Sequence, residues 1–375
     1  MKVLLDYRPA LRERSGVGEY AHQLARALVA GFSPRGGGSL ELTLFSSSWK
    51  DRFIPAAELD GAAAIDRRVP GRLLNLAWHR LEWPPVETLG GDRFDVTHSL
   101  HPLLMPARTA AQVVTIHDLN FLDHPERTRG EIRRDYAPLA RAHAGRAHAI
   151  VTVSQFTARE IERRFGIPAE RIAVCPPGAP PWEPRGSRPA DGYLLFVGTL
   201  EPRKNVGGLL DAYEQLVSRR RGTPRLVIAG KALRESAPWL ERLNRPPLRG
   251  RVQHVGYVEA PDRRALYEGA RLLVQPSFDE GFGMPVLEAM TLGVPVVAAS
   301  RGALPEVLGD AGLLVDPEDP DALATAIDRL IEDDAFASAC AANGVARSRL
   351  YSWDVMARNV YTAYARAVER RCASA

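Results

Sequence analysis

The chain has 375 residues, of which 45% are hydrophobic and 25% charged, and its formal net charge is +4. This length suffices for two domains of ordinary size, and the composition is typical of a globular protein rather than a disordered or fibrous one. The small net charge gives no argument for nucleic acid as a partner, and no apolar run of about eighteen residues indicates a membrane-spanning helix.

The N-terminal segment and the cysteines both favour the cytoplasm. Met1–Asp6 is a short strand-like run that already ends at the acidic Asp6, so it lacks the long apolar core of a signal peptide. The three cysteines are scattered and odd in number: Cys175, Cys340 and Cys372. They indicate neither a disulfide framework nor a zinc site, and they fit a reducing compartment.

Short apolar runs alternate with longer amphipathic stretches. In the first half, helices are predicted at 19–30 and 157–165, with strands at Val3–Asp6, Leu40–Phe45, Val96–Thr97, Val113–Ile116 and Ile150–Val153. In the second half, the predicted helices are 205–219, 262–269, 285–292 and 321–332, and the predicted strands are 193–197, 226–229, 252–255, 272–275, 294–298 and 312–315. Apolar strands separated by helices predict parallel sheets covered on both faces. The Pro/Gly-rich break at 176–189 divides them into two doubly wound, Rossmann-like α/β domains.

Two glutamates, Glu280 and Glu288, mark the most informative stretch of the chain. The first lies in a Gly-rich turn after a predicted strand, and the second lies about one turn into the following helix. Glycines at 281 and 283 let the backbone approach a ligand closely, and Pro285 suits the first helical position, where no N–H is needed. Free N–H groups at that helix start hold phosphate or sugar oxygens. The turn therefore predicts a binding site for a nucleotide sugar.

Other candidate residues also follow predicted strands. Arg203 and Lys204 precede a helix that starts near Asn205; they are either solvated loop cations or neutralise a leaving diphosphate. His117 ends a strand and is either a core histidine or a group near a reacting centre. Ligands sit beyond the carboxyl ends of parallel strands, so two facing domains are expected to bring these groups together.

Gly16 and Gly18 form a glycine loop of low specificity. Position 21 is Ala21, so the Gly-x-Gly-x-x-Gly dinucleotide fingerprint is absent, and no Lys-Ser/Thr pair completes a phosphate-binding P-loop. By themselves these glycines indicate an ordinary loop-to-helix turn.

Five segments together resemble the retaining, two-domain glycosyltransferases of family 4. They occur in the family's order and span most of the chain: the glycine loop 15–20, His117–Asp118, the interdomain linker 174–178, the phosphate loop 197–205 and the paired glutamates. Many members carry an arginine directly after Gly198, where this chain has Thr199, which leaves Arg203 and Lys204 as the basic pair. The Gly-Thr-x-Glu-Pro-Arg-Lys-Asn variant is similar to the branch that includes polysaccharide and O-antigen mannosyltransferases.

This resemblance implies roles for the candidates. His117, Glu280, Arg203 and Lys204 are the expected catalytic residues, with Glu280 on hydroxyls of the donor sugar and His117 positioning that sugar. Glu288 is expected to hold the ribose hydroxyls. The expected donor-binding residues are Gly16, Gly18, Gly198, Thr199, Tyr257, Val258, Gly281, Phe282, Gly283, Met284, Pro285 and Glu288, of which 257 and 258 read the base through their backbone.

The resemblance also implies the GT-B fold and a retaining hexosyl transfer. GDP-mannose is the most expected donor, and UDP-sugars or other GDP-sugars rank after it. The expected acceptor is a glycan or a lipid-linked glycan. We expect no metal and no other cofactor, because basic residues and helix ends carry the phosphate charge. Residues 1–176 are expected to form the acceptor-side domain and 177–352 the donor domain, with a last helix, 353–371, packing back on the first.

Alternatives remain at this stage. One is a sugar-nucleotide epimerase or phosphorylase of similar architecture, and another is a non-catalytic two-domain sugar-binding protein, a class that is usually exported. The aromatic and apolar segment Leu73–Trp83 is expected to pack in the core, and the basic run Arg127–Arg146 to be a solvated helix face. The alternative for both is a peripheral contact with the inner face of a membrane that holds the acceptor.

Overall fold

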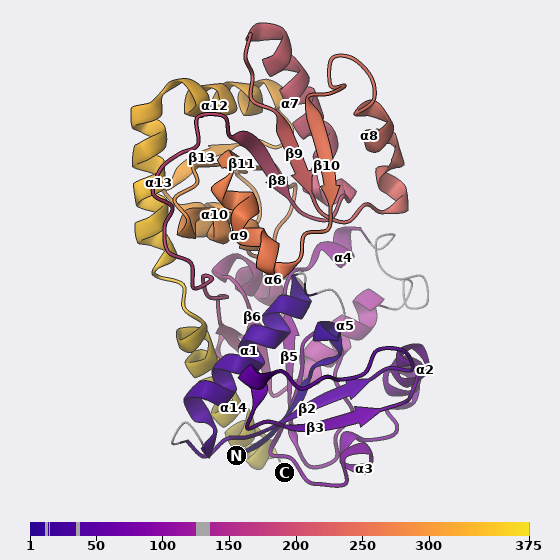
Figure 1. The fold of residues 1–375 in the computed structure, drawn as a ribbon. Helices are drawn as coiled ribbons and strands as arrows, with labels where there is room; N and C mark the ends of the chain where they lie inside the picture. Colours follow the sequence, from indigo (N-terminus) through magenta and orange to yellow (C-terminus); the bar gives the residue numbers. More distant parts are fainter. Residues whose placement is uncertain (12–13, 15, 35–37, 125–135, 375) are drawn as a thin grey trace. The chain divides into compact units, whose positions relative to one another are not determined.

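The computed structural model describes residues 1–375 except 12–13, 15, 35–37, 125–135 and 375. By its internal contacts the chain divides into two units. Unit 1 consists of Met1–Gly178 and Ser352–Ala375, and unit 2 of Ala179–Tyr351. Each unit has one parallel sheet with helices around it, so the predicted α/β class with two doubly wound sheets is confirmed (Figure 1).

The sheet of unit 1 has seven strands in the order β3-β2-β1-β4-β5-β6-β7. The strands are β1 (Lys2–Asp6), β2 (Glu41–Ser47), β3 (Ala63–Arg67), β4 (Val96–Ser99), β5 (Ala111–Ile116), β6 (Ala149–Thr152) and β7 (Ile172–Val174). The helices are α1 (Val17–Phe32), α2 (Gly71–Leu76), α3 (Val86–Gly90), α4 (Asn120–Asp123), α5 (Tyr136–Arg146), α6 (Gln155–Phe165) and α14 (Trp353–Ser374). A π-helical turn, Ala77–Leu81, extends α2.

The direction of the strand order in unit 1 reverses between β1 and β4. Leu4 of β1 pairs with Thr43 of β2 on one side and with Thr97 of β4 on the other. Val3, Leu4 and Leu5 are fully buried because helices cover both faces of the sheet. In open parallel sheets ligands bind beyond the carboxyl ends of the strands at such a reversal.

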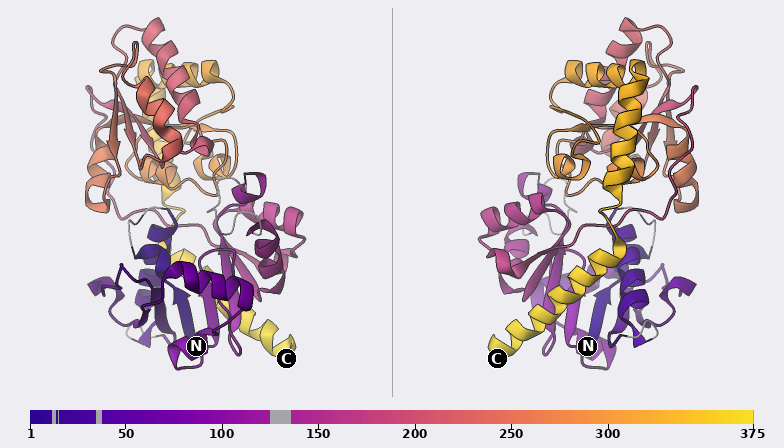
Figure 2. Two further views of the ribbon diagram at one scale, coloured as in Figure 1. Left: turned by 90° about the vertical axis from the view of Figure 1, so that its right-hand side faces the viewer. Right: turned by 90° about the vertical axis from the view of Figure 1, so that its left-hand side faces the viewer.

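The last helix, α14, belongs to unit 1 although it follows unit 2 in the chain. It packs on α1, β5 and β6, and Figure 2 shows it in yellow along this sheet. The imidazole of His98 fixes this packing, because one ring nitrogen lies 2.8 Å from the Tyr364 hydroxyl of α14 and the other 2.8 Å from the Thr115 hydroxyl of β5. His98 therefore has a structural role in holding α14 on this sheet.

The sheet of unit 2 has six strands in the order β10-β9-β8-β11-β12-β13. The strands are β8 (Tyr193–Val197), β9 (Leu226–Ala229), β10 (Val252–Gly256), β11 (Ala270–Gln275), β12 (Val296–Ala299) and β13 (Gly312–Val315). The helices are α7 (Val206–Arg219), α8 (Ala237–Arg242), α9 (Ala260–Glu268), α10 (Met284–Thr291), α11 (Leu304–Leu308), α12 (Pro320–Glu332) and α13 (Asp334–Ser348). This order reverses between β8 and β11, which places a second ligand-binding reversal in unit 2.

Helices α7 and α12 cover one face of the sheet in unit 2. Tyr213 of α7 and Ile327 of α12 are fully buried in one apolar cluster with Phe196 of β8. Asn205 starts α7 from the left-handed region at φ 55°, and its side-chain oxygen accepts from the Gly208 N–H. The Asn205 amide also donates to the Pro317 carbonyl at 2.7 Å, which ties the loop before α7 to the loop after β13.

Buried neutral histidines in unit 1 predict acid instability. Burial, the largest cause, lowers the pKa of His79 and of His98 to about 3 and that of His143 to about 4. The unfolded value is about 6.5, so between pH 6.5 and 4 the unfolded chain binds more protons than the folded one. Stability is therefore complete above pH 6.5 and falls as the solution is acidified, by up to about 1.4 kcal/mol per pH unit for each histidine.

His79→Phe tests this expectation. Among the described residues neither ring nitrogen of His79 has a hydrogen-bond partner, so phenylalanine loses no hydrogen bond. Urea unfolding at pH 7.5, 6 and 5 should show a shallower pH dependence in the variant, with the two chains most different at pH 5. Identical pH dependence would mean that His79 is not held neutral.

Candidate active site

The reversal of strand order in unit 2 brings two predicted loops together. The first follows β8 and contains the short 3₁₀ turn Pro202–Lys204, and the second follows β11. The Phe278 N–H in the second loop donates to the Arg203 carbonyl in the first at 2.8 Å. Two of the predicted motifs therefore form one structure at the carboxyl edge of this sheet.

Glu280 lies at the centre of this structure, with four side chains around its carboxylate. Lys204 Nζ donates to Glu280 Oε1 at 2.5 Å, and Arg203 Nη1 donates to Oε2 at 3.2 Å. The Ser277 hydroxyl and the Gln275 amide donate to Oε1 at 2.9 and 3.1 Å. The structure thus brings together three of the four predicted catalytic residues.

The charges of this cluster are fixed by their mutual contacts. Glu280 and Lys204 are 5% and 8% exposed. Burial alone would raise the pKa of Glu280, but the attraction of Lys204, and then that of Arg203, outweighs burial and holds the pKa at about 2. Burial likewise lowers the pKa of Lys204, while Glu280 opposes that shift. An ionised carboxylate flanked by two cations can accept hydrogen bonds from hydroxyl groups and present positive charge to a phosphate.

The loop after β8 approaches the same cluster through Gly198 and Thr199. A side chain on Gly198 would lie 3.7 Å from the Lys204 side-chain carbons, so this glycine lies over the lysine stem. The Thr199 carbonyl accepts from the Glu201 N–H at 2.8 Å, which bends the chain. Glu201 in turn pairs with Arg203 Nε at 2.7 Å. The backbone around Gly198 thus lies beside both Lys204 and Arg203.

The turn from Gly281 to Pro285 leads from the Glu280 cluster into α10. Gly283 caps the helix at φ 105°, a conformation that favours glycine. Met284 is the first helical residue and Pro285 the second, so the prediction of Pro285 at the first position was wrong by one residue. Proline has no N–H, and none is needed in this first turn. Phe282 is buried edge-on against Tyr351 at 5.5 Å between ring centroids, so it packs inside unit 2.

Gly302 packs directly against the backbone of Glu280. Its φ is +62°, and an added Cβ would lie 2.7 Å from the Glu280 carbonyl oxygen and 2.8 Å from the Glu280 nitrogen. The neighbouring Ala303 N–H donates to that same carbonyl at 2.9 Å. Sequence reasoning missed this residue, because its partner lies more than twenty positions away and only the fold brings them together.

Glu288 is held by a different pair of residues on α9. Tyr267 Oη donates to Glu288 Oε2 at 2.7 Å, and Arg263 Nη1 donates to Oε1 at 3.1 Å. The second glutamate therefore lies on the same turn-and-helix unit as Glu280 but belongs to a separate cluster. Tyr257 and Val258 follow β10 directly and precede α9, as predicted.

The candidates in unit 1 gather around the start of α1. Gly16 is the N-cap residue of this helix, at φ 51°, and Gly18 is buried in its first turn; Ser15 of the predicted loop lies outside the described residues. Tyr20 of α1 contacts His117 edge-on, with 4.9 Å between ring centroids. Burial, the largest cause, lowers the pKa of His117 to about 4, so the ring is neutral at physiological pH and suited to positioning rather than to acid catalysis.

An ion pair that the sequence did not indicate lies at the reversal of strand order in unit 1. Asp6 at the end of β1 is fully buried and accepts two hydrogen bonds from Arg8, at 2.8 and 2.7 Å. His101, after β4, lies 3.6 Å from the same carboxylate. The Arg8 guanidinium also lies over the Trp78 ring at 4.8 Å. An acid at the end of a strand is common, so no local pattern signals this pairing.

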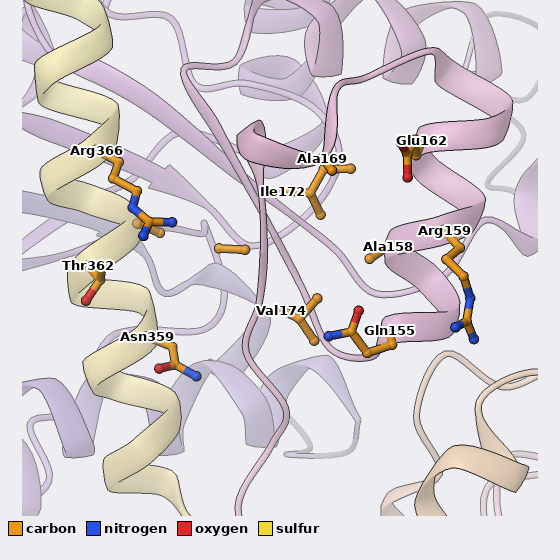
Figure 3. A pocket seen from close by; sticks show the side chains of 12 residues that line it. Gln155, Ala158, Arg159, Glu162, Ala169, Ile172, Val174, Asn359, Thr362 and Arg366 are labelled. Carbon is orange, nitrogen blue, oxygen red and sulfur yellow. The ribbon is translucent and has the colours of Figure 1, made fainter.

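A cavity of about 470 Å³ lies elsewhere in unit 1, at the edge strand β7 between α6 and α14 (Figure 3). Gln155, Ala158 and Glu162 line one wall, and Asn359, Thr362 and Arg366 the other. It contains none of the predicted site residues and lies away from the β1/β4 reversal. This cavity is therefore separate from the candidate clusters described above.

The Asp-Pro-Asp triplet at 319–321 has a structural role. Asp319 caps α12 by accepting from the Ala322 N–H at 2.9 Å, and Asp321 pairs with Arg219 at 2.7 Å. Within the described ranges no three His, Cys, Asp or Glu side chains are grouped as metal ligands. Over the same part of the chain, each helix is too short or too polar to span a bilayer.

Comparisons with known proteins agree with this fold. The family described as "Glycosyltransferase Family 4" matches residues 14–182, and that described as "Glycosyl transferases group 1" matches residues 191–333. The chain is 33% identical to the O-antigen chain mannosyltransferase B of Escherichia coli, over 97% of this chain and 99% of that protein. It is also 33% identical to a D-inositol 3-phosphate glycosyltransferase of Xylanimonas cellulosilytica, over 97% of this chain and 94% of that protein.

Two solved structures show the same fold. Sucrose-phosphate synthase from Thermosynechococcus elongatus superposes with a TM-score of 0.77 at 20% identity and covers 100% of both chains. The lipopolysaccharide glycosyltransferase WaaG superposes with a TM-score of 0.71 at 16% identity, covering 96% of this chain and 98% of that one. The fold is that of the GT-B enzymes. The chain belongs to the family 4 glycosyltransferases, and it is therefore an enzyme that transfers a glycosyl group.

Proposed function

We propose that the chain transfers mannose from GDP-mannose to a glycan or lipid-linked acceptor with retention of configuration. The names of its relatives support the sugar: beside the mannosyltransferase above, the serotype-specific mannosyltransferase WbdA of Escherichia coli is 30% identical over 64% of this chain. UDP-sugars are the second candidate, because the solved HepE of Anabaena, with a TM-score of 0.67, holds UDP and glucose.

The Glu280 cluster carries this proposal. When a nucleoside diphosphate leaves the sugar, negative charge develops on its phosphate oxygens, and fixed cations near them lower the barrier. Arg203 and Lys204 supply those cations, and the ionised Glu280 accepts hydrogen bonds from the sugar hydroxyls. In this proposal Glu288 holds the ribose, the backbone at 257 and 258 meets the base, His117 positions the transferred sugar, and unit 1 serves the acceptor side.

Nucleotide choice is tested by thermal unfolding in the presence of GDP, UDP and ADP. A ligand at a hundred times its dissociation constant adds about 2.7 kcal/mol to the free energy of unfolding. We expect GDP to stabilise the chain most. Stabilisation by ADP alone would contradict the proposed donor class, and stabilisation by UDP alone would move the donor to a UDP-sugar.

Lys204→Ala should weaken the binding of GDP and leave that of guanosine unchanged. The lysine ammonium is expected to contact the diphosphate, and a charged hydrogen bond lost there costs roughly 1.5–3 kcal/mol, or about ten- to a hundredfold in affinity. Calorimetry with both ligands measures the two effects, and Lys50→Ala on the surface of unit 1 is the control. Equal losses for GDP and guanosine would mean that Lys204 is not a phosphate contact.

We expect transfer to persist in EDTA, because Arg203 and Lys204 already supply positive charge. Asp319→Asn and Asp321→Asn should keep their activity as well, since asparagine caps a helix as aspartate does and the Asp321–Arg219 ion pair is exposed. Activity measured with EDTA, and again after added magnesium or manganese, checks this expectation. Loss on chelation that a divalent ion restores would contradict a metal-independent mechanism.

We also propose that one surface of unit 1 contacts an anionic membrane. In the Leu73–Trp83 segment the sequence prediction of core packing holds for one face, because Leu74 and Trp78 are 2% and 1% exposed. The other face is apolar and open to solvent: Leu73, Leu76, Leu81 and Trp83 are 58–71% exposed. Four exposed arginines lie in and before the same segment, at 67, 68, 72 and 80. An apolar face beside arginines complements an anionic bilayer surface.

Vesicle sedimentation tests the membrane contact. The chain should bind vesicles that contain phosphatidylglycerol and not vesicles of phosphatidylcholine alone. The double variant Leu76→Ser/Leu81→Ser should bind at least about tenfold more weakly, because it removes apolar area from this face. Leu350→Ser, at a leucine of unit 2 that is 72% exposed, is the matched control and should bind normally. Equal binding by the chain and by the double variant would rule out this surface.

A further inference from the structure

Strand β7 forms one edge of the sheet of unit 1, and the cavity of Figure 3 lies along its outer side. Directly after β7, the Cys175 N–H donates to the Thr152 carbonyl of β6 at 2.7 Å. Successive residues of a strand direct their backbone groups to opposite edges, so the N–H and C=O groups of Val174 and Ile172 point away from β6. Within the described ranges β6 is the only strand that pairs with β7, so these outward groups have no partner strand.

Two helices form the walls of this cavity. All three residues of β7 line it, and Figure 3 shows Gln155 of α6 and Asn359 of α14 on either side of Val174. Ala158 of α6 and Ala363 of α14 also line the cavity, and these short side chains leave room for a further backbone beside the strand. The cavity therefore gives an extended chain access to the open edge of β7.

The open edge of β7 lacks most of the features that keep edge strands from pairing with another chain. Such features include charged residues, bulges and short length. The opposite edge strand of the same sheet, β3, carries Asp66 and Arg67, and the edge strand β10 of unit 2 has an irregular register between His254 and Gly256. By contrast, β7 is uncharged and pairs with β6 in regular register, so its length of three residues is its only such feature. Strand addition to an open edge is a common mode of peptide recognition.

Two arginines determine the charge of the cavity. Arg159 lines the wall formed by α6, and Arg366 lines the wall formed by α14. Over the part of the chain that the structure describes, neither side chain forms an ion pair with an aspartate or a glutamate. Glu162 is the one acidic residue among those that line the cavity, so the lining keeps a positive excess. A ligand with acidic side chains complements this charge.

We propose that the open edge of β7 binds an extended, acidic segment of a partner protein, which adds an eighth strand to the seven-stranded sheet of unit 1. Main-chain hydrogen bonds to Val174 and Ile172 supply the affinity, as in other cases of strand addition. Arg159 and Arg366 select for acidic side chains on the added strand. The cavity contains none of the residues that the proposed function uses, so this interaction is independent of that function.

Fluorescence anisotropy with two labelled, end-blocked heptapeptides tests this proposal. One peptide alternates valine with glutamate, and the other alternates valine with lysine. The acidic peptide should bind about tenfold more tightly than the basic one, and its affinity should fall as salt is added. NMR-detected hydrogen exchange on the wild-type chain gives a second measurement. The acidic peptide should slow the exchange of the Val174 and Ile172 amides, which contact with the arginines alone would not do.

Two kinds of variant separate the strand edge from the charges. Val174→Pro removes the outward N–H and keeps the pairing with β6, since proline is tolerated where an edge strand turns its N–H outward. It should bind the acidic peptide about tenfold or more weakly. Arg159→Glu/Arg366→Glu should reverse the preference toward the basic peptide, and it tests the proposal even if the proline variant does not fold. Arg249→Glu/Arg349→Glu changes two exposed arginines of unit 2, and as the control it should keep the wild-type preference.

Several outcomes would overturn the proposal. One is that the acidic peptide does not bind at millimolar concentration, and another is that it binds a folded Val174→Pro variant as tightly as the wild type. Equal affinity for the acidic and the basic peptide would remove the role of the arginines. Sedimentation tests a different occupant: a dimer that Val174→Pro abolishes would mean that β7 pairs with a second copy of this chain, which contradicts a separate partner.

Discussion

Glu280→Gln should lower kcat/KM by about a hundredfold or more. The substitution keeps the shape of the side chain and its capacity to accept from sugar hydroxyls, but it removes the negative charge that organises Lys204 and Arg203. Groups that are held in place for the transition state typically contribute about 10²–10³ in rate when removed singly. Steady-state kinetics with GDP-mannose measure the loss.

The same substitution should also lower stability, so the two effects have to be separated. Glutamine leaves the Lys204 ammonium buried without its carboxylate, and removing one partner of a buried ion pair costs about 3–5 kcal/mol. The double variant Glu280→Gln/Lys204→Met removes both charges and keeps a stem of similar length. It should recover most of the stability in urea unfolding while its activity stays low.

Glu201→Gln is the control for charge near Arg203. The Glu201 carboxylate pairs with Arg203 Nε at 2.7 Å, and its backbone carbonyl, which the substitution keeps, accepts from the Lys204 N–H at 3.0 Å. Its activity should stay within a few fold of the wild type. Wild-type activity in a folded Glu280→Gln variant would remove this residue from the active site.

Gly302→Ala should lower activity about a hundredfold without touching any ligand. An added Cβ would press on the Glu280 backbone at 2.7 and 2.8 Å, distances that real Cβ atoms do not show, so the backbone of Glu280 has to move. A displacement of about 1 Å at a catalytic group costs about 10² in rate. Kinetics together with a crystal structure of the variant check both the loss and the shift.

Gly222→Ala is the matched control for backbone strain. Gly222 also has a positive φ, +79°, but an added Cβ there would have no neighbour within 4 Å. Both variants carry the cost of placing alanine in the left-handed region, roughly 1 kcal/mol. Only Gly302→Ala should lose activity beyond that cost. Equal kinetics in the two variants would show that Gly302 does not support Glu280.

The sequence predicted the fold well where strands form continuous apolar runs. The strands at 193–197, 226–229 and 312–315 were predicted with the bounds that the structure has. The edge strands β3 and β7 were missed, because residues such as Ala63 and Ala64 are exposed and carry no continuous apolar run. Helix α13 was missed as well, since its many alanines and polar residues give a weak amphipathic pattern.

The site was predictable in its charged residues but not in their supports. Glu280, Arg203 and Lys204 follow strand ends, and the parallel topology brings those ends together. Their supports come from elsewhere in the fold: Gly302 touches Glu280 through the backbone, and Tyr267 reaches Glu288 from the preceding helix. Such contacts depend on how helices pack on the sheet, and no local pattern of residue types specifies them.

Transfer from GDP-mannose is the most direct test of the proposed activity. The purified chain is incubated with GDP-mannose and a mannose-terminated oligosaccharide, GDP release is followed with and without that acceptor, and NMR gives the anomeric configuration of the product. We predict that GDP release depends on the acceptor, that the new mannosyl linkage has the same α configuration as the donor, and that Glu280→Gln makes little product. A β-linked product would contradict retaining transfer. Nucleoside diphosphate release no faster than that of Glu280→Gln, with GDP-mannose and with UDP-sugars alike, would contradict transfer by the Glu280 cluster.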